Sequence, residues 1–108
     1  MVLGVDYGTI SGGGSLTPTL LDSYTNTSHG DYTLTAEVGK RYLLTGFGHS
    51  SFSLSAFTST GCNIIDNQLG TVNTYVPFAV FFEATSTTVE IKYNCTYYGY
   101  SAMFYQLD

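Results

Sequence analysis

The amino-acid sequence predicts an all-β fold, an antiparallel β-sandwich that is jelly-roll-like, with eight or nine short strands. Three observations predict it. Apolar and polar residues alternate with a period of two over most of the 108 residues, which is the pattern of strands with one solvated face. No window of about a dozen residues has the apolar spacing of an amphipathic helix. Turn residues recur about every 8–12 positions, as in sandwiches and barrels.

The N-terminal part of the chain is divided by a glycine-rich segment. Residues 3–9 are predicted to form a strand, and "SGGGS" at 11–15 has the composition of a flexible connector. The predicted organisation is therefore an N-terminal arm with its connector, residues 1–15, followed by a single β-sandwich domain, residues 16–108. A chain of this length is near the modal size for one hydrophobic core.

The middle of the chain shows the clearest alternation. "DYTLTAEV" places Tyr32 and Leu34 on one face and threonines on the other. Gly39 follows, and "VGK" predicts a tight hairpin to the next alternating run. The strands predicted in this part of the chain are residues 17–22, 31–37, 41–47, 51–57 and 62–66.

The C-terminal strands are predicted at residues 73–83, 87–93 and 98–106. "TTVEIKY" alternates in the usual way, whereas "VPFAVFFEA", residues 76–84, is apolar on both faces. A strand of this kind needs cover on both faces, and a sandwich this small has no helical layer to cover the outer one. The sequence therefore predicts that identical chains cover each other.

We expect a homo-oligomer, with a trimer favoured over a dimer. "YSAMFYQL" near the C-terminus is also apolar on both faces. An interface rich in Phe, Tyr and Met and poor in charge is typical of obligate oligomers. The predicted oligomer interface consists of Val76, Phe78, Val80, Phe81, Phe82, Met103 and Tyr105.

The charge balance argues against two classes of partner. The chain has three basic and eight acidic residues, for a net charge of −5. Nucleic acids require clustered Lys and Arg, and an anionic membrane surface requires a similar cluster. No apolar run reaches the ~20 residues of a membrane-spanning helix, and residues 1–15 lack the pattern of a secretory signal. We therefore expect no nucleic acid and no membrane among the partners.

Few residues could carry chemistry. His29 and His49 lie in turn-like segments, and no nucleophile motif accompanies them. The carboxylates form no dense calcium-binding loop, and their spacing does not indicate a glycosidase pair. The sequence therefore predicts no enzyme, no catalytic residue, no metal and no cofactor. Cys62 and Cys95 are either two free thiols or one disulfide, and the sequence leaves both open.

Tyrosine is the one residue type that points to binding. The chain has ten tyrosines, and several of them cluster toward its C-terminal end. Their rings can stack on the apolar C–H groups of a sugar, form protein interfaces, or fill the core with their hydroxyls at its rim. All three explanations stay open. The residues of the glycan-binding hypothesis are Tyr93, Tyr97, Tyr98 and Tyr100.

Three segments share a pattern of strands and turns with a known family. The first is "TLTAEVGKRYLLTGFGHS", the second is "FAVFFEATSTTVEIKY", and the third is the aromatic strand "YSAMFYQLD" with its acidic end. Together they resemble the small β-sandwich domains of phage virion proteins, as found in tail fibres, baseplates and head fibres. The resemblance covers about residues 31–108, and its motifs contain no catalytic residue.

The resemblance implies a structural protein of the virion, an oligomeric appendage or decoration displayed on the phage head or tail that contacts the host surface. We expect residues 1–15 to attach the domain to other virion proteins. One alternative is a module that binds a cell-surface glycan through the tyrosine cluster. Another is a phage protein that sequesters a small host metabolite in a pocket between subunits.

Overall fold

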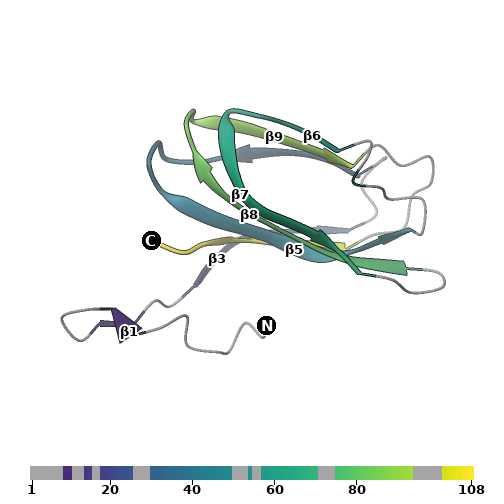
Figure 1. Cartoon of the computed structure of the whole chain (residues 1–108), viewed down its shortest axis with the longest axis horizontal. Helices are drawn as coiled ribbons and strands as arrows, with labels where there is room; N and C mark the ends of the chain where they lie inside the picture. The colour runs from purple at the N-terminus through teal and green to yellow at the C-terminus, as the bar shows by residue number, and fades with distance from the viewer. Residues whose placement is uncertain are drawn as a thin grey trace.

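The computed structural model describes residues 9–10, 14–15, 18–25, 30–49, 54, 57–70, 75–93 and 101–108. These residues form two antiparallel sheets, of five and three strands, that pack face to face, together with a separate two-stranded pair (Figure 1). No α-helix occurs among the residues described. The predicted all-β sandwich is confirmed, because the alternation in the sequence separates a buried face from a solvated face in each sheet.

The strands are β1 (Thr9–Ile10), β2 (Gly14–Ser15), β3 (Thr19–Thr25), β4 (Asp31–Thr35), β5 (Arg41–His49), β6 (Phe57–Thr60), β7 (Cys62–Leu69), β8 (Tyr75–Ala84), β9 (Thr88–Tyr93) and β10 (Ser101–Gln106). The five-stranded sheet has the order β3-β10-β5-β8-β7, the three-stranded sheet has the order β4-β9-β6, and β1 pairs with β2. From β3 onward each strand passes to the other sheet, as in a jelly roll. The exception is β7, which pairs with the next strand, β8.

The connection between β4 and β5 is a corner between the two sheets, which corrects the predicted hairpin. β4 pairs with β9, while β5 pairs with β10 and β8, so the strands on either side of Gly39 do not pair with each other. The Lys40 N–H donates to the Glu37 carbonyl at 3.1 Å, and Gly39 has a φ of 88°. These features are those of a β-turn with glycine at its third position. A glycine between two alternating runs therefore marks the turn but not the pairing of the strands.

Three such corners meet at one end of the sandwich (Figure 1). The Gly39 N–H donates to the Ala84 carbonyl at 2.9 Å, and the Thr85 N–H donates to the Gly61 carbonyl at 2.9 Å, so the corners are bonded to one another. Gly61, between β6 and β7, has a φ of 77°, and a Cβ there would lie 2.3 Å from the Thr88 carbonyl oxygen. Only glycine fits this position.

Aromatic side chains form a large part of the core. Tyr42 stacks on both Phe82 and Phe104, with ring centroids 5.6 and 5.2 Å apart, and Phe78 lies 5.0 Å from Tyr93. All five side chains are at most 3% exposed. Aromatic pairs of this kind contribute about 0.5–1.5 kcal/mol each beyond the burial of their surface. The core of a single chain therefore accounts for much of the aromatic content.

The predicted strands differ from the observed ones mainly in segments rich in Gly and Ser. The strand predicted at 51–57 is observed only at its last residue, where β6 begins, and most of that segment lies outside the described residues. Within the connector predicted at 11–15, Gly14–Ser15 pairs with Thr9–Ile10. The strand predicted at 3–9 lies outside the described residues except for its last position. The division into an arm and a sandwich domain stays a prediction.

Candidate functional site

The outer face of the three-stranded sheet is polar across all its strands. Each outward position alternates with a core residue, as the burial of β4 and β9 shows. The Thr60 hydroxyl lies 3.4 Å from a carboxylate oxygen of Glu90 on the neighbouring strand. The outward side chains are Asp31, Thr33, Thr35, Thr58, Thr60, Thr88, Glu90 and Lys92. This is the ordinary composition of a solvated sheet face.

The outer face of the five-stranded sheet carries a continuous row of large apolar side chains, which we call the apolar row. It consists of Leu20 in β3, Tyr105 in β10, Leu43 in β5 and Phe81 in β8. Each is the direct cross-strand partner of the next, so the row crosses four adjacent strands. Asp66 in β7 is the partner of Phe81 and ends the row with a charge.

Burial separates the apolar row from the core. Leu20 is 53% exposed, and Tyr105 and Phe81 are half-buried. Leu43 is only 9% exposed, yet it is not a member of the core cluster. It lies between Tyr105 and Phe81 in the row, and side chains at direct cross-strand positions are close enough to cover one another. The row is therefore a ridge of large side chains on the outside of the sandwich.

A row of smaller side chains runs beside the ridge, and we call it the hollow row. It consists of Thr45 in β5, Ala79 in β8 and Gln68 in β7, again direct cross-strand partners. On β10 the same level is occupied by Met103, the partner of Thr45, and this large side chain ends the hollow. A shallow cavity of about 310 Å³ lies here, with the hollow row and Pro77 among its lining residues. The Thr45 hydroxyl donates to the Phe78 carbonyl at 2.9 Å, so one polar group of the hollow is already bonded to the backbone.

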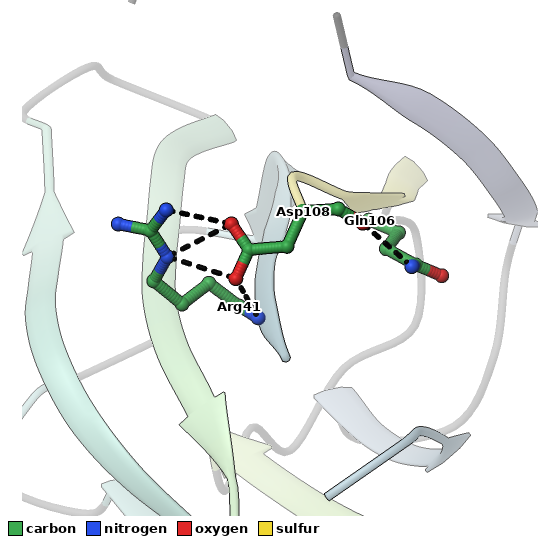
Figure 2. A network of polar contacts seen from close by, with 3 residues as sticks. All are labelled: Arg41, Gln106 and Asp108. Carbon is green, nitrogen blue, oxygen red and sulfur yellow. Dashed lines mark hydrogen bonds and ion pairs between the residues drawn. The ribbon is translucent and has the colours of Figure 1, made fainter. Parts of the chain in front are cut away.

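An ion pair between Arg41 and Asp108 lies at one end of the same face (Figure 2). Arg41 is the first residue of β5, and its Nη2 lies 2.6 Å from Oδ1 of Asp108, while its Nε lies 2.9 and 3.0 Å from the two carboxylate oxygens. The Leu107 N–H donates to the Arg41 carbonyl at 2.9 Å. The Gln106 side-chain amide donates to the main-chain oxygen of Asp108 at 2.8 Å. The segment after β10 is thereby joined to the start of β5.

The ion pair shifts two pKa values in opposite directions. The hydrogen bond from Arg41 lowers the pKa of the Asp108 carboxyl, and the same bond raises the pKa of Arg41, with a further contribution from Glu83. The side chains of Arg41 and Asp108 are 44% and 23% exposed, so solvent screens their attraction. The pair therefore contributes about 0–1 kcal/mol to stability. Charge on this face lies at its end and not at its centre.

Most of the predicted interface residues lie in the core, which corrects the prediction for them. They face the three-stranded sheet and are at most 7% exposed within one chain, so a second copy cannot reach them: Val76, Phe78, Val80 and Phe82. The remaining predicted interface residues, Phe81, Met103 and Tyr105, lie on the outer face of the five-stranded sheet. Met103 is 42% exposed, and the Tyr105 hydroxyl donates to its sulfur at 3.4 Å.

Tyr93 also belongs to the core, which corrects its assignment to a glycan-binding cluster. Its side chain is fully buried. Its hydroxyl donates to Oδ1 of Asn67 across the sandwich, and burial raises the pKa of the phenol. The other residues of that hypothesis, Tyr97, Tyr98 and Tyr100, lie outside the described residues.

Sequence reasoning missed part of the outer face. Leu20 and Leu43 are both in the apolar row, and Phe47, which lies on the same face of β5, is 46% exposed. A signal for the two leucines was present, because each is followed directly by another leucine. Successive residues of a strand point to opposite faces, so one leucine of each pair cannot point into the core.

Residues with reactive side chains are few in the described part of the chain. Cys62 is a free, half-buried thiol whose pKa is raised by burial, and Cys95 and His29 lie outside the described residues. Among the residues described, no group of three or more His, Cys, Asp and Glu could hold a metal ion. No helix in that part of the chain has the length and apolar character needed to cross a membrane.

Comparisons with protein-family models, with curated proteins and with solved structures found no match for this chain. The function proposed for the chain therefore rests on the site and on the resemblance noted in its sequence.

Proposed function

We propose that this chain is a non-enzymatic structural protein of a phage virion, an oligomeric appendage or decoration whose subunits are held together through the outer face of the five-stranded sheet. The contrast between the two outer faces carries the proposal. Both alternate with core residues, yet one carries Thr, Asp, Glu and Lys and the other carries the apolar row. Solvation alone does not explain the apolar row, and contact with a neighbouring subunit would cover it.

The free energy available from burying the outer face of the five-stranded sheet supports contact with another subunit. Leu20, Phe47 and Met103 are 53%, 46% and 42% exposed. Fully burying a side chain of this kind contributes about 1.5–3 kcal/mol, so each retains a substantial part of that free energy for association. A contiguous apolar patch with charge only at its margins is typical of a protein interface.

The virion setting is supported by the resemblance of residues 31–108 to virion β-sandwich domains. In this proposal the polar outer face of the three-stranded sheet is displayed outward, and residues 1–15 attach the domain to other virion proteins. The homotrimer expected from the sequence is one way to cover the apolar row, and a pair of chains is another. The glycan-binding alternative has no support from a described side chain, since Tyr93 lies in the core.

Purified particles of the phage that encodes the chain test the proposal. We expect mass spectrometry to find the chain in them at a fixed ratio to the other virion proteins. Phe81→Asp should be lost from the particles, because it places a charge in the apolar row, whereas the matched control Thr33→Asp on the polar face should be retained. Circular dichroism checks that both variants fold. Particles that lack the wild-type chain would overturn the proposal.

A further inference from the structure

We infer that the neighbour at this face is a second copy of the chain, packed so that the β5 and β8 part of the apolar row of each copy fills the β5 and β8 part of the hollow row of the other. The inference rests on the proposed function, because it requires the outer face of the five-stranded sheet to be an interface. It adds the identity of the partner, the symmetry of the pair and the side chains that meet.

The shape of the face is self-complementary. Phe81 and Ala79 are two residues apart in β8, and Leu43 and Thr45 are two residues apart in β5. Residues at this spacing point to the same face of a strand and lie ~6.8 Å apart along it. On β5 and β8 a ridge of large side chains therefore runs parallel to a hollow of small ones, whereas on β10 both levels carry large side chains, Tyr105 and Met103. A shallow depression of about 310 Å³ lies at the hollow, with Ala79 and Thr45 among its lining residues.

A twofold axis parallel to the two rows, and midway between them, brings each ridge onto a hollow. Rotation about this axis turns the sheet over and exchanges the positions of the rows. Phe81 of one copy then lies opposite Ala79 of the other, and the reverse contact is identical, as in any isologous interface. The two sheets pack face to face, ~10 Å apart, as sheets do inside a sandwich.

The level of each row along the strands favours this pairing over a trimer. In the twofold pair, the end of the face with Arg41 and Glu83 lies over the opposite end of the other copy, where Phe47 and Pro77 are cross-strand partners. Three copies around an axis parallel to the strands would set the level of Arg41 and Glu83 in each copy beside the same level of the next copy. They would also set ridge against ridge and hollow against hollow.

The area of the face is at the lower limit for a specific pair. Five strands at ~4.8 Å spacing and a strand length of about 20 Å give a face of about 480 Å². Two copies therefore bury about 1,000 Å² in total, which is the lower bound for a specific interface. The centre is uncharged, and Arg41, Glu83 and Asp66 lie at its margins, which matches the apolar core and polar rim of known interfaces.

Two complementary substitutions test the pairing on the chain of 108 residues. Phe81→Ala removes the ridge, and Ala79→Leu fills the hollow. Each alone should weaken the wild-type pair by about 30-fold or more, as expected for a central contact. In an equal mixture, the filled hollow of one variant meets the trimmed ridge of the other, and the second ridge meets an unmodified hollow. We expect mixed pairs to dominate in native mass spectrometry.

The outcomes separate this inference from the proposed function. A wild-type dimer together with dominant mixed pairs supports both. A wild-type trimer keeps the proposed function and overturns the pairing. A dimer whose variants associate in the statistical ratio overturns the ridge-in-hollow contact alone, and a wild-type monomer at micromolar concentration overturns both. Both positions lie on the outer face, and a cooperative unfolding transition in each variant establishes that loss of pairing is not loss of folding.

Discussion

Glu90 in the three-stranded sheet and Phe81 in the five-stranded sheet hold equivalent positions. Each points outward from a strand, and the residue before and after each one is fully buried. Folding does not require an apolar residue at either position, because a sheet in a sandwich needs only one apolar face. The two sheets nevertheless differ on their outer faces. The difference indicates that the apolar row is not needed to form the core and has another role.

The first prediction compares Phe82 with Phe81, which are adjacent in β8. Phe82→Ala removes a side chain that is 0% exposed and stacks on Tyr42, so we expect a loss of about 3–5 kcal/mol in the free energy of unfolding. Phe81→Ala should cost the isolated chain about 1 kcal/mol or less, while it weakens association. Urea unfolding at low protein concentration measures the difference. Equal losses would mean that Phe81 is a core residue.

The second prediction transfers the apolar character to the polar face. Glu90→Leu with Thr33→Leu places two leucines on neighbouring strands of the three-stranded sheet, since these positions are cross-strand partners. Each leucine contributes about 1.5–3 kcal/mol when a contact buries it, so we expect a new mode of self-association. Sedimentation velocity should detect it even when Phe81→Ala is combined with the double variant. Unchanged sedimentation would show that apolar surface alone does not drive contact.

The third prediction concerns the hydrogen bond from Tyr93 in the three-stranded sheet to Asn67 in the five-stranded sheet. Tyr93→Phe leaves the buried side of Asn67 without its donor, and we expect a loss of about 1–2 kcal/mol in stability. Tyr105→Phe is the matched control, because its hydroxyl bonds Met103 on the outer face and should change stability by less than about 0.5 kcal/mol. Thermal unfolding of the two variants provides the comparison. A larger effect of Tyr105→Phe would contradict the assignment of faces.

The fourth and smallest effect is expected at the charged end of the five-stranded face. The pKa of Asp108 is lowered in the folded chain, so its contribution to stability is present above the ordinary carboxyl pKa and is lost as the pH falls through the folded value. Asp108→Asn should therefore cost about 0–1 kcal/mol at pH 7 and nothing once Asp108 is protonated. Thermal unfolding against pH measures it, and a cost that persists in acid would indicate a role other than the ion pair.

Alternation alone was enough to predict the fold class and the core face of most strands. Alternation gives no information on which strands pair with each other. For this reason the turn at Gly39 was predicted to be a hairpin, whereas the structure shows a corner between the two sheets. The pattern of one strand is the same whether its neighbour in sequence lies beside it or in the opposite sheet. Corners in a sandwich are fixed by long-range backbone bonds such as that from Gly39 to Ala84.

The candidate site was predicted in part. The segment "VPFAVFFEA" was correctly identified as apolar on both faces, but the predicted interface mixed the two faces. Glu83 has the same parity as Phe81, and a carboxylate belongs on the solvated side, so the outer face could have been identified from this residue. The apolar row could not be predicted in the same way, because Leu20 and Tyr105 become neighbours only through the register of β3 and β10. This register cannot be read from a single sequence.

The most direct test of the interface is the solvent exposure of Met103 in the assembled protein. In a single chain this side chain is 42% exposed on the outer face of the five-stranded sheet. Hydroxyl-radical footprinting should therefore find Met103 protected in the wild-type protein at micromolar concentration and oxidised in Phe81→Asp, with circular dichroism to show that the variant is folded. Oxidation of Met103 at the same rate in both proteins would contradict the claim that this face is covered.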